Sequence, residues 1–435
     1  MSGPGEQGTR TGKPSVPSAS VPAPIFALVA GEDSGDQLGA ELIEALRALH
    51  PDARFVGVGG PRMRAVGFEA WHDIGELSVM GLAEVLRHLP RLLRLRSRLT
   101  RRLTALKPDV FIGVDAPDFN LGLEHKLKRA GIRTVHYVSP SIWAWREKRA
   151  AKIGGSADRV LCLFPMEPAI YAKYGVDARF VGHPLADRFP LISDREAARA
   201  ELGLAQDAPV LALLPGSRRS EIHRLGAIFL QAAERVRAQI PNLQVVVPAA
   251  NDRCRREIEG LLKSMEPGTR DQGPEGAIEP GPGSPAPGPL LLSGHSHRAM
   301  AAADVVLLAS GTAALEAMLA KRPMVVGYRI AALTYRIVRG LNLLKTSIYS
   351  LPNVLAGHAL VPELMQDECT AENLADEVLR LFNEPGRRAL MVNAFERMHL
   401  NLHIGGGAAA AAARAASALL PTACARGESP HEHET

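Results

Sequence analysis

Short runs of Val, Ile, Leu and Ala alternate along the chain with longer segments whose apolar residues recur every three or four positions. The short runs predict buried strands, and the longer segments predict helices that cover them. In the first half, strands are predicted at 25–30, 54–58, 110–114, 134–138, 159–163 and 178–181, and helices at about 35–49, 121–130 and 144–153. Continuous Val/Ile-rich strands separated by helices are typical of a parallel sheet that is covered on both faces.

The same pattern restarts after Pro190. Strands are predicted at 210–214, 244–248, 290–292, 305–308 and 324–327, with helices at 220–239, 252–264 and 312–320. The predicted fold class is therefore α/β, with two doubly wound domains in tandem that place a ligand in the cleft beyond the carboxyl ends of their strands. We expect domains at 24–187 and 188–370, followed by helical residues 371–420 that pack back across the domain junction.

Three segments fall outside this pattern. Residues 1–23 are rich in Gly, Pro and Ser and residues 421–435 are polar, so both are expected to be disordered tails without chemistry. Residues 266–289 are dense in Gly and Pro and are predicted to form a surface loop inserted in the second domain.

The composition is that of a globular protein, with 46% hydrophobic and 22% charged residues in a chain of 435, enough for two hydrophobic cores. No apolar run approaches the ~20 residues that a membrane-spanning helix needs, and the N-terminus does not read as a secretory signal. We therefore expect a cytoplasmic protein without a transmembrane segment. The four cysteines form no CxxC pair, which argues against a zinc site or a disulfide framework.

The net charge of +5 permits an acidic partner, and its distribution indicates which kind. Residues 87–107 hold seven arginines and one lysine, interleaved with leucines, and no acidic residue. Such a basic and apolar segment favours an anionic lipid surface, although an ordinary helix with core leucines and solvated arginines is the alternative. No aromatic residue lies between Trp71 and Phe111 to stack on bases, which argues against nucleic acid. The residues predicted to contact the membrane are Val79, Met80, Leu82, Leu86, Arg91 and Arg94.

Two loops of the predicted second domain are typical of a nucleotide site. Residues 214–222, LPGSRRSEI, pass from a strand through a glycine turn into a helix, and the guanidinium groups of Arg218 and Arg219 suit a diphosphate. Residues 309–316, ASGTAALE, also start a helix, whose free N–H groups can bind phosphate while Glu316 accepts hydrogen bonds from ribose. Exposed loop-capping arginines and a capping box from Thr312 are the alternatives. These loops predict a nucleotide-binding set of Gly216, Ser217, Arg218, Ser310, Gly311, Thr312 and Glu316.

Candidate chemistry in the first domain centres on residues 110–120, VFIGVDAPDFN. A carboxylate after a buried strand can take a proton from an incoming hydroxyl. Asp118 is better placed to cap a helix that begins near Phe119, which leaves Asp115 as the candidate general base. The loop AGEDSGD at 30–36 can approach a polar ligand or form a plain tight turn.

The segment 136–146, HYVSPSIWAWR, holds two of the three tryptophans. With Arg146, their faces can hold a sugar or an acylated phosphoglycolipid, but a buried Trp pair is equally in keeping with the sequence. His183, between the two domains, suits a hinge or core position as well as a ligand contact. The residues predicted to contact acceptor or donor sugar are Ser34, Asp118, Asn120, Ser139, Trp143 and Arg146.

Several motifs occur in an order that resembles the lipid A disaccharide synthase family over about 24–370: AGEDSGD, FVGVGGPRM, SVMGLAEVL, GVDAPDFN, HYVSPSIWAWREKR, GHPLAD, LLPGSR, ASGTAALEAMLA, PMVVGYR and SLPNVLAG. The resemblance implies a GT-B fold, in which two Rossmann-like domains face each other across a cleft. It implies transfer from UDP-2,3-diacylglucosamine to 2,3-diacylglucosamine 1-phosphate (lipid X) through a β-1,6 bond, with inversion and release of UDP, at the cytoplasmic face of the inner membrane. Asp115 matches the family's essential carboxylate, and Arg218 and Glu316 match its nucleotide side, to which the last two motifs add Tyr328 and Asn353.

No metal and no cofactor are expected, because the chain lacks the Asp-x-Asp pair that usually holds a metal–diphosphate. Arg218, Arg219 and the helix start at Gly311 would then meet the charge of the leaving group. The nearest alternatives are a UDP-N-acetylglucosamine epimerase and a lipid II-type N-acetylglucosaminyltransferase, neither of which needs the basic apolar helix. A nucleotide-dependent nucleic-acid-binding module is the alternative from another class. The oligomeric state is open, with a homodimer among the options.

Overall fold

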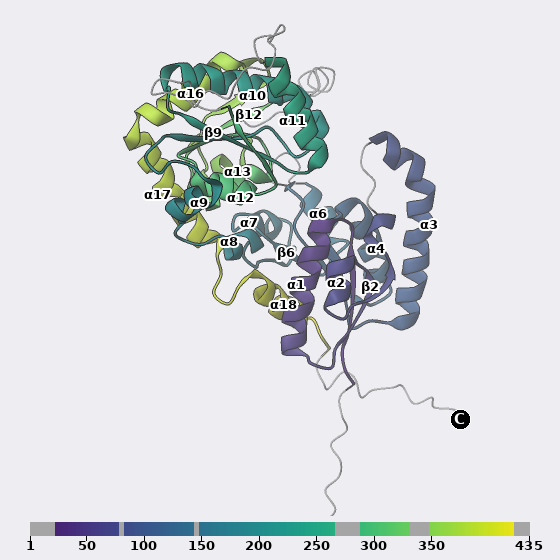
Figure 1. The fold of residues 1–435 in the computed structure, drawn as a ribbon. Helices are drawn as coiled ribbons and strands as arrows, with labels where there is room; N and C mark the ends of the chain where they lie inside the picture. Colours follow the sequence, from purple (N-terminus) through teal and green to yellow (C-terminus); the bar gives the residue numbers. More distant parts are fainter. Residues whose placement is uncertain (1–21, 78–81, 143–147, 266–287, 331–347, 422–435) are drawn as a thin grey trace, which may run out of the picture.

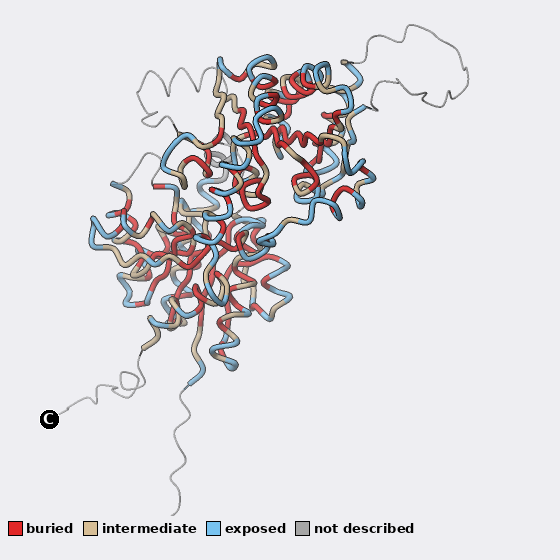
Figure 2. Tube along the Cα trace, turned by 90° about the vertical axis from the view of Figure 1, so that its left-hand side faces the viewer, coloured by how far each residue is buried: buried red, intermediate tan, exposed pale blue. Residues whose placement is uncertain are grey.

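The computed structural model of the protein describes residues 22–77, 82–142, 148–265, 288–330 and 348–421. Within them the chain forms two all-parallel sheets, each covered by helices (Figure 1). The buried stretches of the chain gather in two groups, one inside each domain (Figure 2). The predicted class of two doubly wound α/β domains is confirmed.

The first sheet has seven described strands in the order β3-β2-β1-β4-β5-β6-β7. These are β1 (Ile25–Ala30), β2 (Arg54–Val58), β3 (Glu69–His72), β4 (Val110–Val114), β5 (Arg133–Tyr137), β6 (Arg159–Cys162) and β7 (Ala178–Phe180). The strand order reverses between β1 and β4, so the loops that follow these two strands meet at the switch point where α/β sheets bind ligands. The helices are α1 (Asp33–Leu49), α2 (Pro61–Ala65), α3 (Leu82–Leu106), α4 (Pro117–Arg129), α6 (Arg149–Gly154) and α7 (Glu167–Ala172).

The second sheet has six described strands in the order β10-β9-β8-β11-β12-β13, with its switch point between β8 and β11. These are β8 (Val210–Leu214), β9 (Gln244–Ala249), β10 (Leu290–Ser293), β11 (Val305–Ala309), β12 (Met324–Tyr328) and β13 (Glu363–Met365). Every residue of β8 and β11 is buried, as expected for central strands covered on both faces. The helices α10 (Arg219–Gln239), α11 (Asp252–Met265) and α16 (Ala371–Asn383) lie on one face, and α12 (Ser296–Ala302) and α13 (Thr312–Leu319) on the other (Figure 1).

The two domains are joined by two adjacent crossings of the chain. The first crossing runs through α8 (Pro184–Arg188) into α9 (Arg195–Leu202). Two further helices of the second domain are α15 (Leu351–Ala356) and α17 (Pro385–Leu402). The second crossing leads from α17 to α18 (Ala408–Ser417), which packs on α1 and adds Ala412 and Ala416 to the core of the first sheet. The backbone N–H of His183 donates to the carbonyl oxygen of Leu402 at 2.9 Å, which ties the crossings together.

The basic helix α3 lies along the outer edge of the first domain (Figure 1). In its carboxyl-terminal half, Leu95, Leu99 and Leu103 are buried in the hydrophobic cluster that contains Leu123 and Leu127 of α4. Farther towards its start, Leu89 and Leu93 are 42% and 46% exposed. The helix is therefore divided: the core alternative holds for its second half, whereas Leu89 and Leu93, on either side of Pro90, face solvent.

Two details differ from the sequence-based prediction. Helix α4 begins at Pro117, with Ala116 in the left-handed region as its N-cap, so Asp118 is already inside the helix and is not the cap we expected. The edge strands β3 and β13 were not predicted, because their three or four residues are only partly buried and form no continuous apolar run. No helix of the described residues is long and apolar enough to cross a membrane.

Candidate active site

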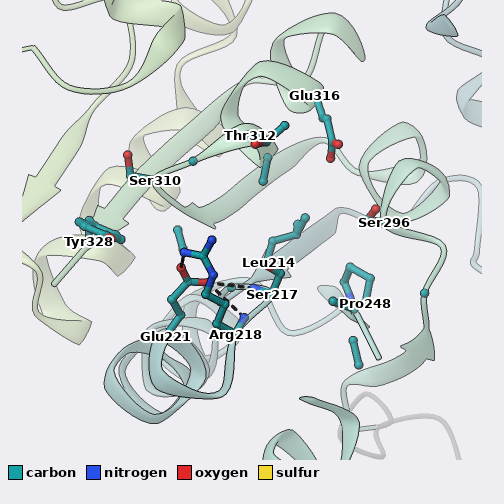
Figure 3. A pocket seen from close by; sticks show the side chains of 17 residues that line it. Leu214, Ser217, Arg218, Glu221, Pro248, Ser296, Ser310, Thr312, Glu316 and Tyr328 are labelled. Atoms are coloured by element: carbon teal, nitrogen blue, oxygen red, sulfur yellow. Dashed lines mark hydrogen bonds and ion pairs between the residues drawn. The ribbon is translucent and has the colours of Figure 1, made fainter. Parts of the chain in front are cut away.

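A cavity of about 480 Å³ opens at the carboxyl ends of β8, β9, β11 and β12 (Figure 3). The loop after β8 and the start of α13 form its two opposite sides. All but one of the residues predicted to bind the nucleotide line it, namely Gly216, Ser217, Arg218, Ser310, Gly311, Thr312, Glu316 and Tyr328. The structure also places Glu221, Pro248, Gly294 and Ser296 there, which the sequence analysis did not single out.

Glu221 shapes the loop that carries Arg218. Its Oε2 accepts hydrogen bonds from the backbone N–H groups of Ser217 at 3.0 Å and Arg218 at 3.2 Å. Gly216 has a φ of +130°, and a Cβ at this position would lie 2.5 Å from the Cβ of Glu221, so only glycine fits. The sequence signal for Glu221 was its position three residues after the helix N-cap Arg218, the spacing of a capping acid.

Arg218 and Arg219 point to different places. The Arg218 side chain is 72% exposed and lines the cavity, with its Nη1 3.7 Å from Glu221 Oε1. Arg219 instead forms an ion pair with Glu257 of α11 across 2.6 Å and lines a separate groove between α10 and α11. Arg218 alone of the pair therefore faces the cavity, and the expected joint binding of one diphosphate by both arginines stays a prediction.

The opposite side of the cavity is the amino end of α13. Gly311 is the N-cap, with a φ of +155° and no atom within 4 Å of the position a Cβ would take, so the backbone is open to a ligand. Thr312 is the first helical residue, which removes the alternative of a capping box that starts from its side chain. Glu316, one turn along, is 19% exposed and lies 3.6 Å from His297 Nε2. The helix therefore presents backbone N–H groups and a carboxylate to the same space.

Asn353 is not brought to this cavity. Its Nδ2 donates to the Val361 carbonyl oxygen at 2.9 Å and to Glu363 Oε1 at 2.7 Å. Its Oδ1 accepts from the backbone N–H groups of Leu360 and Val361. The side chain is buried and holds the loop before β13, which is a structural task.

Asp115 lies at the switch point of the first sheet, on a turn with unusual backbone geometry. Asp115 and Ala116 have φ values of +53° and +45°, a left-handed pair without glycine that is strained by sterics. The turn is fixed from both sides: the Asp115 N–H donates to the Tyr137 carbonyl oxygen at 2.8 Å, and Asn120 Nδ2 donates to the Asp115 carbonyl oxygen at 2.8 Å. Strain that is held in place by such contacts is common at functional sites.

The loop after β1 touches this turn. A Cβ on Gly31 would lie 2.7 Å from the Cβ of Ala116, so the two loops approach as closely as glycine allows. Ser34 is exposed in the first turn of α1, at this same end of the sheet. Asp36, which ends the AGEDSGD motif, is buried and accepts hydrogen bonds from the backbone N–H groups of Gly60, Arg62 and Met63. That aspartate holds α2 and is not free for a ligand.

The remaining predicted sugar contacts are scattered around this end of the domain. The Asp118 side chain is 98% exposed and lies 3.7 Å from Arg149. Asn120 is fully buried under the Asp115 turn, and Ser139 is buried with its Oγ 3.0 Å from the Tyr171 hydroxyl. Trp143 and Arg146 lie outside the described residues, as do Val79 and Met80.

His183 caps a helix at the first crossing. Its Nδ1 accepts the N–H of Leu185 at 3.1 Å, and its ring lies 5.3 Å from that of Phe164. Burial lowers the pKa of His183 to about 4, so the ring is neutral near pH 7. His183 is therefore a buried capping residue at the first crossing.

Comparison with known proteins shows the family to which the chain belongs. Residues 26–271 and 287–406 match the family model described as lipid-A-disaccharide synthetase. A lipid-A-disaccharide synthase of Xanthomonas campestris pv. campestris (strain 8004) is 58% identical over 388 residues, which cover 89% of this chain and 84% of the relative. One of Xylella fastidiosa (strain M12) is 55% identical over 383 residues, covering 88% and 95%. The chain belongs to the lipid-A-disaccharide synthase family. It is a glycosyltransferase of lipid A disaccharide synthesis.

Solved structures extend the likeness of the fold beyond that family. The calicheamicin glycosyltransferase CalG4 aligns with a TM-score of 0.55 at 17% identity, over 92% of this chain and 99% of that one. The UDP-GlcNAc 2-epimerase of Neisseria meningitidis aligns with a TM-score of 0.54 at 12% identity, over 85% and 93%. At such identities the likeness concerns the fold alone, which is GT-B as the resemblance of the motifs implied.

Proposed function

We propose that this lipid-A-disaccharide synthase homologue joins UDP-2,3-diacylglucosamine to lipid X through a β-1,6 bond, with inversion at the anomeric carbon and release of UDP. The observation that carries the proposal is the pairing of two switch points. The Arg218 loop and the amino end of α13 lie at one, between β8 and β11, and the strained Asp115 turn lies at the other, between β1 and β4. A donor bound on the second domain and an acceptor bound on the first would then meet between them.

The donor half of the proposal rests on the two sides of the 480 Å³ cavity. The Arg218 guanidinium would contact the diphosphate, and the open N–H groups at Gly311 and Thr312 would face it from the amino end of α13. Glu316 would accept hydrogen bonds from the ribose hydroxyls. As the sugar leaves the diphosphate, these same groups stabilise the charge that develops on UDP.

The acceptor half rests on Asp115. Its carboxylate would take the proton of the acceptor's 6-hydroxyl while that oxygen attacks the anomeric carbon and the bond to UDP breaks. A single displacement of this kind inverts the anomeric centre, which accounts for a β product from an α-linked donor. The backbone contacts that fix the turn would keep the carboxylate in line for the attack.

We propose further that no divalent ion takes part, because Arg218 and the α13 terminus can meet the leaving-group charge themselves. No group of three His, Cys, Asp or Glu side chains is placed to hold a metal in the described part of the chain. Turnover should therefore persist in EDTA. Abolition by EDTA and recovery with Mg²⁺ or Mn²⁺ would contradict this part of the proposal.

The membrane part of the proposal rests on four exposed residues of α3, Leu89, Arg91, Leu93 and Arg94. Both substrates carry acyl chains, so the cleft must work at a bilayer surface, which we take to be the cytoplasmic face of the inner membrane. Leu89 and Leu93 are exposed, as are the neighbouring Arg91 and Arg94, so apolar and basic side chains are presented together. That combination supports reversible attachment to anionic lipid.

Product analysis tests the proposed reaction. The protein is mixed with UDP-2,3-diacylglucosamine and lipid X, and the products are examined by mass spectrometry and by NMR of the anomeric linkage. A tetra-acylated disaccharide 1-phosphate with a β-1,6 bond, together with UDP, is the expected result. Epimerisation of UDP-N-acetylglucosamine without any disaccharide would replace the proposal by the epimerase alternative.

A further inference from the structure

A second cavity, of about 750 Å³, lies at the opposite end of the second sheet from the nucleotide cavity. Its walls are the segments that enter β8, β11 and β12, together with residues of α9, α16 and α17. Helices α9 and α17 lie side by side at this end of the domain (Figure 1). Five cationic side chains and two carboxylates line the cavity: Arg195, Arg199, Lys321, Arg322 and Arg388, with Asp207 and Asp304.

The carboxylates do not neutralise this charge. Asp304 is shared by Arg195 and Arg199, at 2.6 and 2.8 Å, and also accepts the backbone N–H of Val210. Asp207 is exposed and forms no ion pair with any described residue. Two of the cations therefore use Asp304. The other three form no ion pair with a carboxylate among the described residues, although the charge of Glu396 acts on Lys321.

Arg322 is the cation that stands out. Its Nε is buried and has no hydrogen-bond acceptor, and no ion pair joins its guanidinium to a carboxylate in the described part of the chain. Burial and the neighbouring charges of Arg195 and Arg199, offset in part by Asp304, lower the pKa of Arg322 to about 10. A partly buried guanidinium without a partner is unfavourable, and an anion would relieve it.

Lys321 adds a second cation beside it. This side chain is only 6% exposed, and its Nζ contacts neutral groups, the Pro190 carbonyl oxygen at 2.7 Å and His399 Nδ1 at 2.6 Å. Across the cavity, Arg388 of α17 donates to the carbonyl oxygens of Leu381 and Phe382 at the end of α16. None of these partners carries a negative charge.

We propose that this cavity is a binding site for a small phosphate-bearing anion, with Arg322 as the main contact and Lys321 and Arg388 as further cations. Guanidinium groups bind phosphate oxygens in pairs, and the volume suits a small phosphorylated molecule as well as inorganic phosphate. The site is separate from the nucleotide cavity, which opens at the other end of the same strands. Lys321 also donates to the Pro190 carbonyl oxygen at the first crossing, so the site adjoins the segment that joins the domains.

Thermal unfolding in the presence of saturating UDP tests the site, since UDP keeps phosphate out of the nucleotide cavity. The probes are inorganic phosphate and glycerol 3-phosphate, each compared with chloride at equal ionic strength. Wild-type protein should gain about 2–4 °C or more in Tm with a phosphate probe. The Arg322→Met variant should lose that gain, whereas the control Arg235→Met, at an exposed position on α10, should keep it.

The probes also separate the two sources of phosphate. A larger gain with glycerol 3-phosphate identifies a phosphate ester as the ligand, and a larger gain with inorganic phosphate identifies the free ion. Equal gains for wild type and Arg322→Met, or no gain over chloride with either probe, would overturn the proposal.

A crystallographic measurement covers the case in which Arg322→Met does not fold. Wild-type crystals with UDP are soaked in tungstate, a heavy analogue of phosphate, and the anomalous signal is located. A peak beside Arg322 supports the site. Peaks elsewhere only, or none, would overturn it.

Discussion

Asn120 donates a hydrogen bond from its Nδ2 to the backbone carbonyl oxygen of Asp115, across 2.8 Å, and a second one to the carbonyl oxygen of Val29 at 3.1 Å. The side chain is fully buried. It therefore joins the turn after β4 to the end of β1. The left-handed backbone at Asp115 is thus held by a side chain of α4 that is itself bonded to β1. Asn120 is a positioning residue in the proposed mechanism, not a substrate contact.

We expect Asn120→Ala to lower kcat by roughly 10-fold to 100-fold, because small misplacement of a reacting group has effects of that size. The free energy of unfolding should fall by about 1–3 kcal/mol, the range for backbone acceptors left unsatisfied in a buried site. UDP affinity, measured by calorimetry, should stay unchanged since the nucleotide cavity is in the other domain. Unchanged kcat in a correctly folded variant would show that the turn needs no such support.

The divergence of Arg218 and Arg219 gives a matched pair of variants. Arg218→Ala should weaken UDP binding by about 1.5–3 kcal/mol, the range for hydrogen bonds to charged groups. Arg219→Ala should leave UDP affinity nearly unchanged, because its partner is Glu257 outside the cavity. Calorimetric titration of both proteins with UDP makes the comparison. Equal losses from the two variants would mean that Arg219 turns towards the nucleotide when it binds.

These two arginines also illustrate what sequence can and cannot predict. The buried runs predicted most of the strands, and the glycine turns after β8 and β11 predicted residues that line the 480 Å³ cavity, because both signals are local. The ion pair of Arg219 with Glu257 depends on how α10 packs against α11, which no local pattern contains. The same holds for Asn353 of α15, because its hydrogen bonds to Leu360, Val361 and Glu363 depend on how this helix packs against the chain that enters β13.

Helix α3 shows a related limit. Its leucines repeat at helical spacing along the whole length, so the sequence predicts an apolar face without telling which part of it is covered. The position of α4 decides this, because Leu123 and Leu127 share a hydrophobic cluster with Leu95, Leu99 and Leu103. The edge strands β3 and β13 were not predicted for another reason. A partly buried strand needs few apolar residues, so it leaves no apolar run in the sequence.

The division of α3 predicts two classes of variant. Replacing Leu89 and Leu93 by serine, with Arg91 and Arg94 by glutamate, should abolish sedimentation with anionic liposomes and leave the Tm near that of wild type. In contrast, Leu99→Ala should lower the free energy of unfolding by about 2–5 kcal/mol, as for other buried leucines, and keep liposome binding. If the quadruple variant still sediments with vesicles, these four residues of α3 are not the membrane contact.

The buried His183 predicts a pH dependence of stability. Its folded-state pKa, about 4, lies below the ordinary value of 6.5, so the unfolded chain takes up the proton first as the pH falls. Stability from this residue is complete above pH 6.5 and is lost as the pH falls towards 4, by roughly 2–3 kcal/mol. His183→Asn keeps a capping acceptor but does not titrate, so its urea midpoint should fall less than that of wild type between pH 7 and pH 4. Parallel pH profiles for the two proteins would contradict this.

The most direct test of the proposed mechanism is turnover by the Asp115→Asn variant, followed as disaccharide 1-phosphate formed per unit time from UDP-2,3-diacylglucosamine and lipid X. The replacement keeps the size of the side chain and removes its basicity. We predict a variant that folds and binds UDP like the wild type but has lost on the order of 10²-fold or more in kcat, the scale of general-base loss. Wild-type turnover in that variant would remove Asp115 from the mechanism.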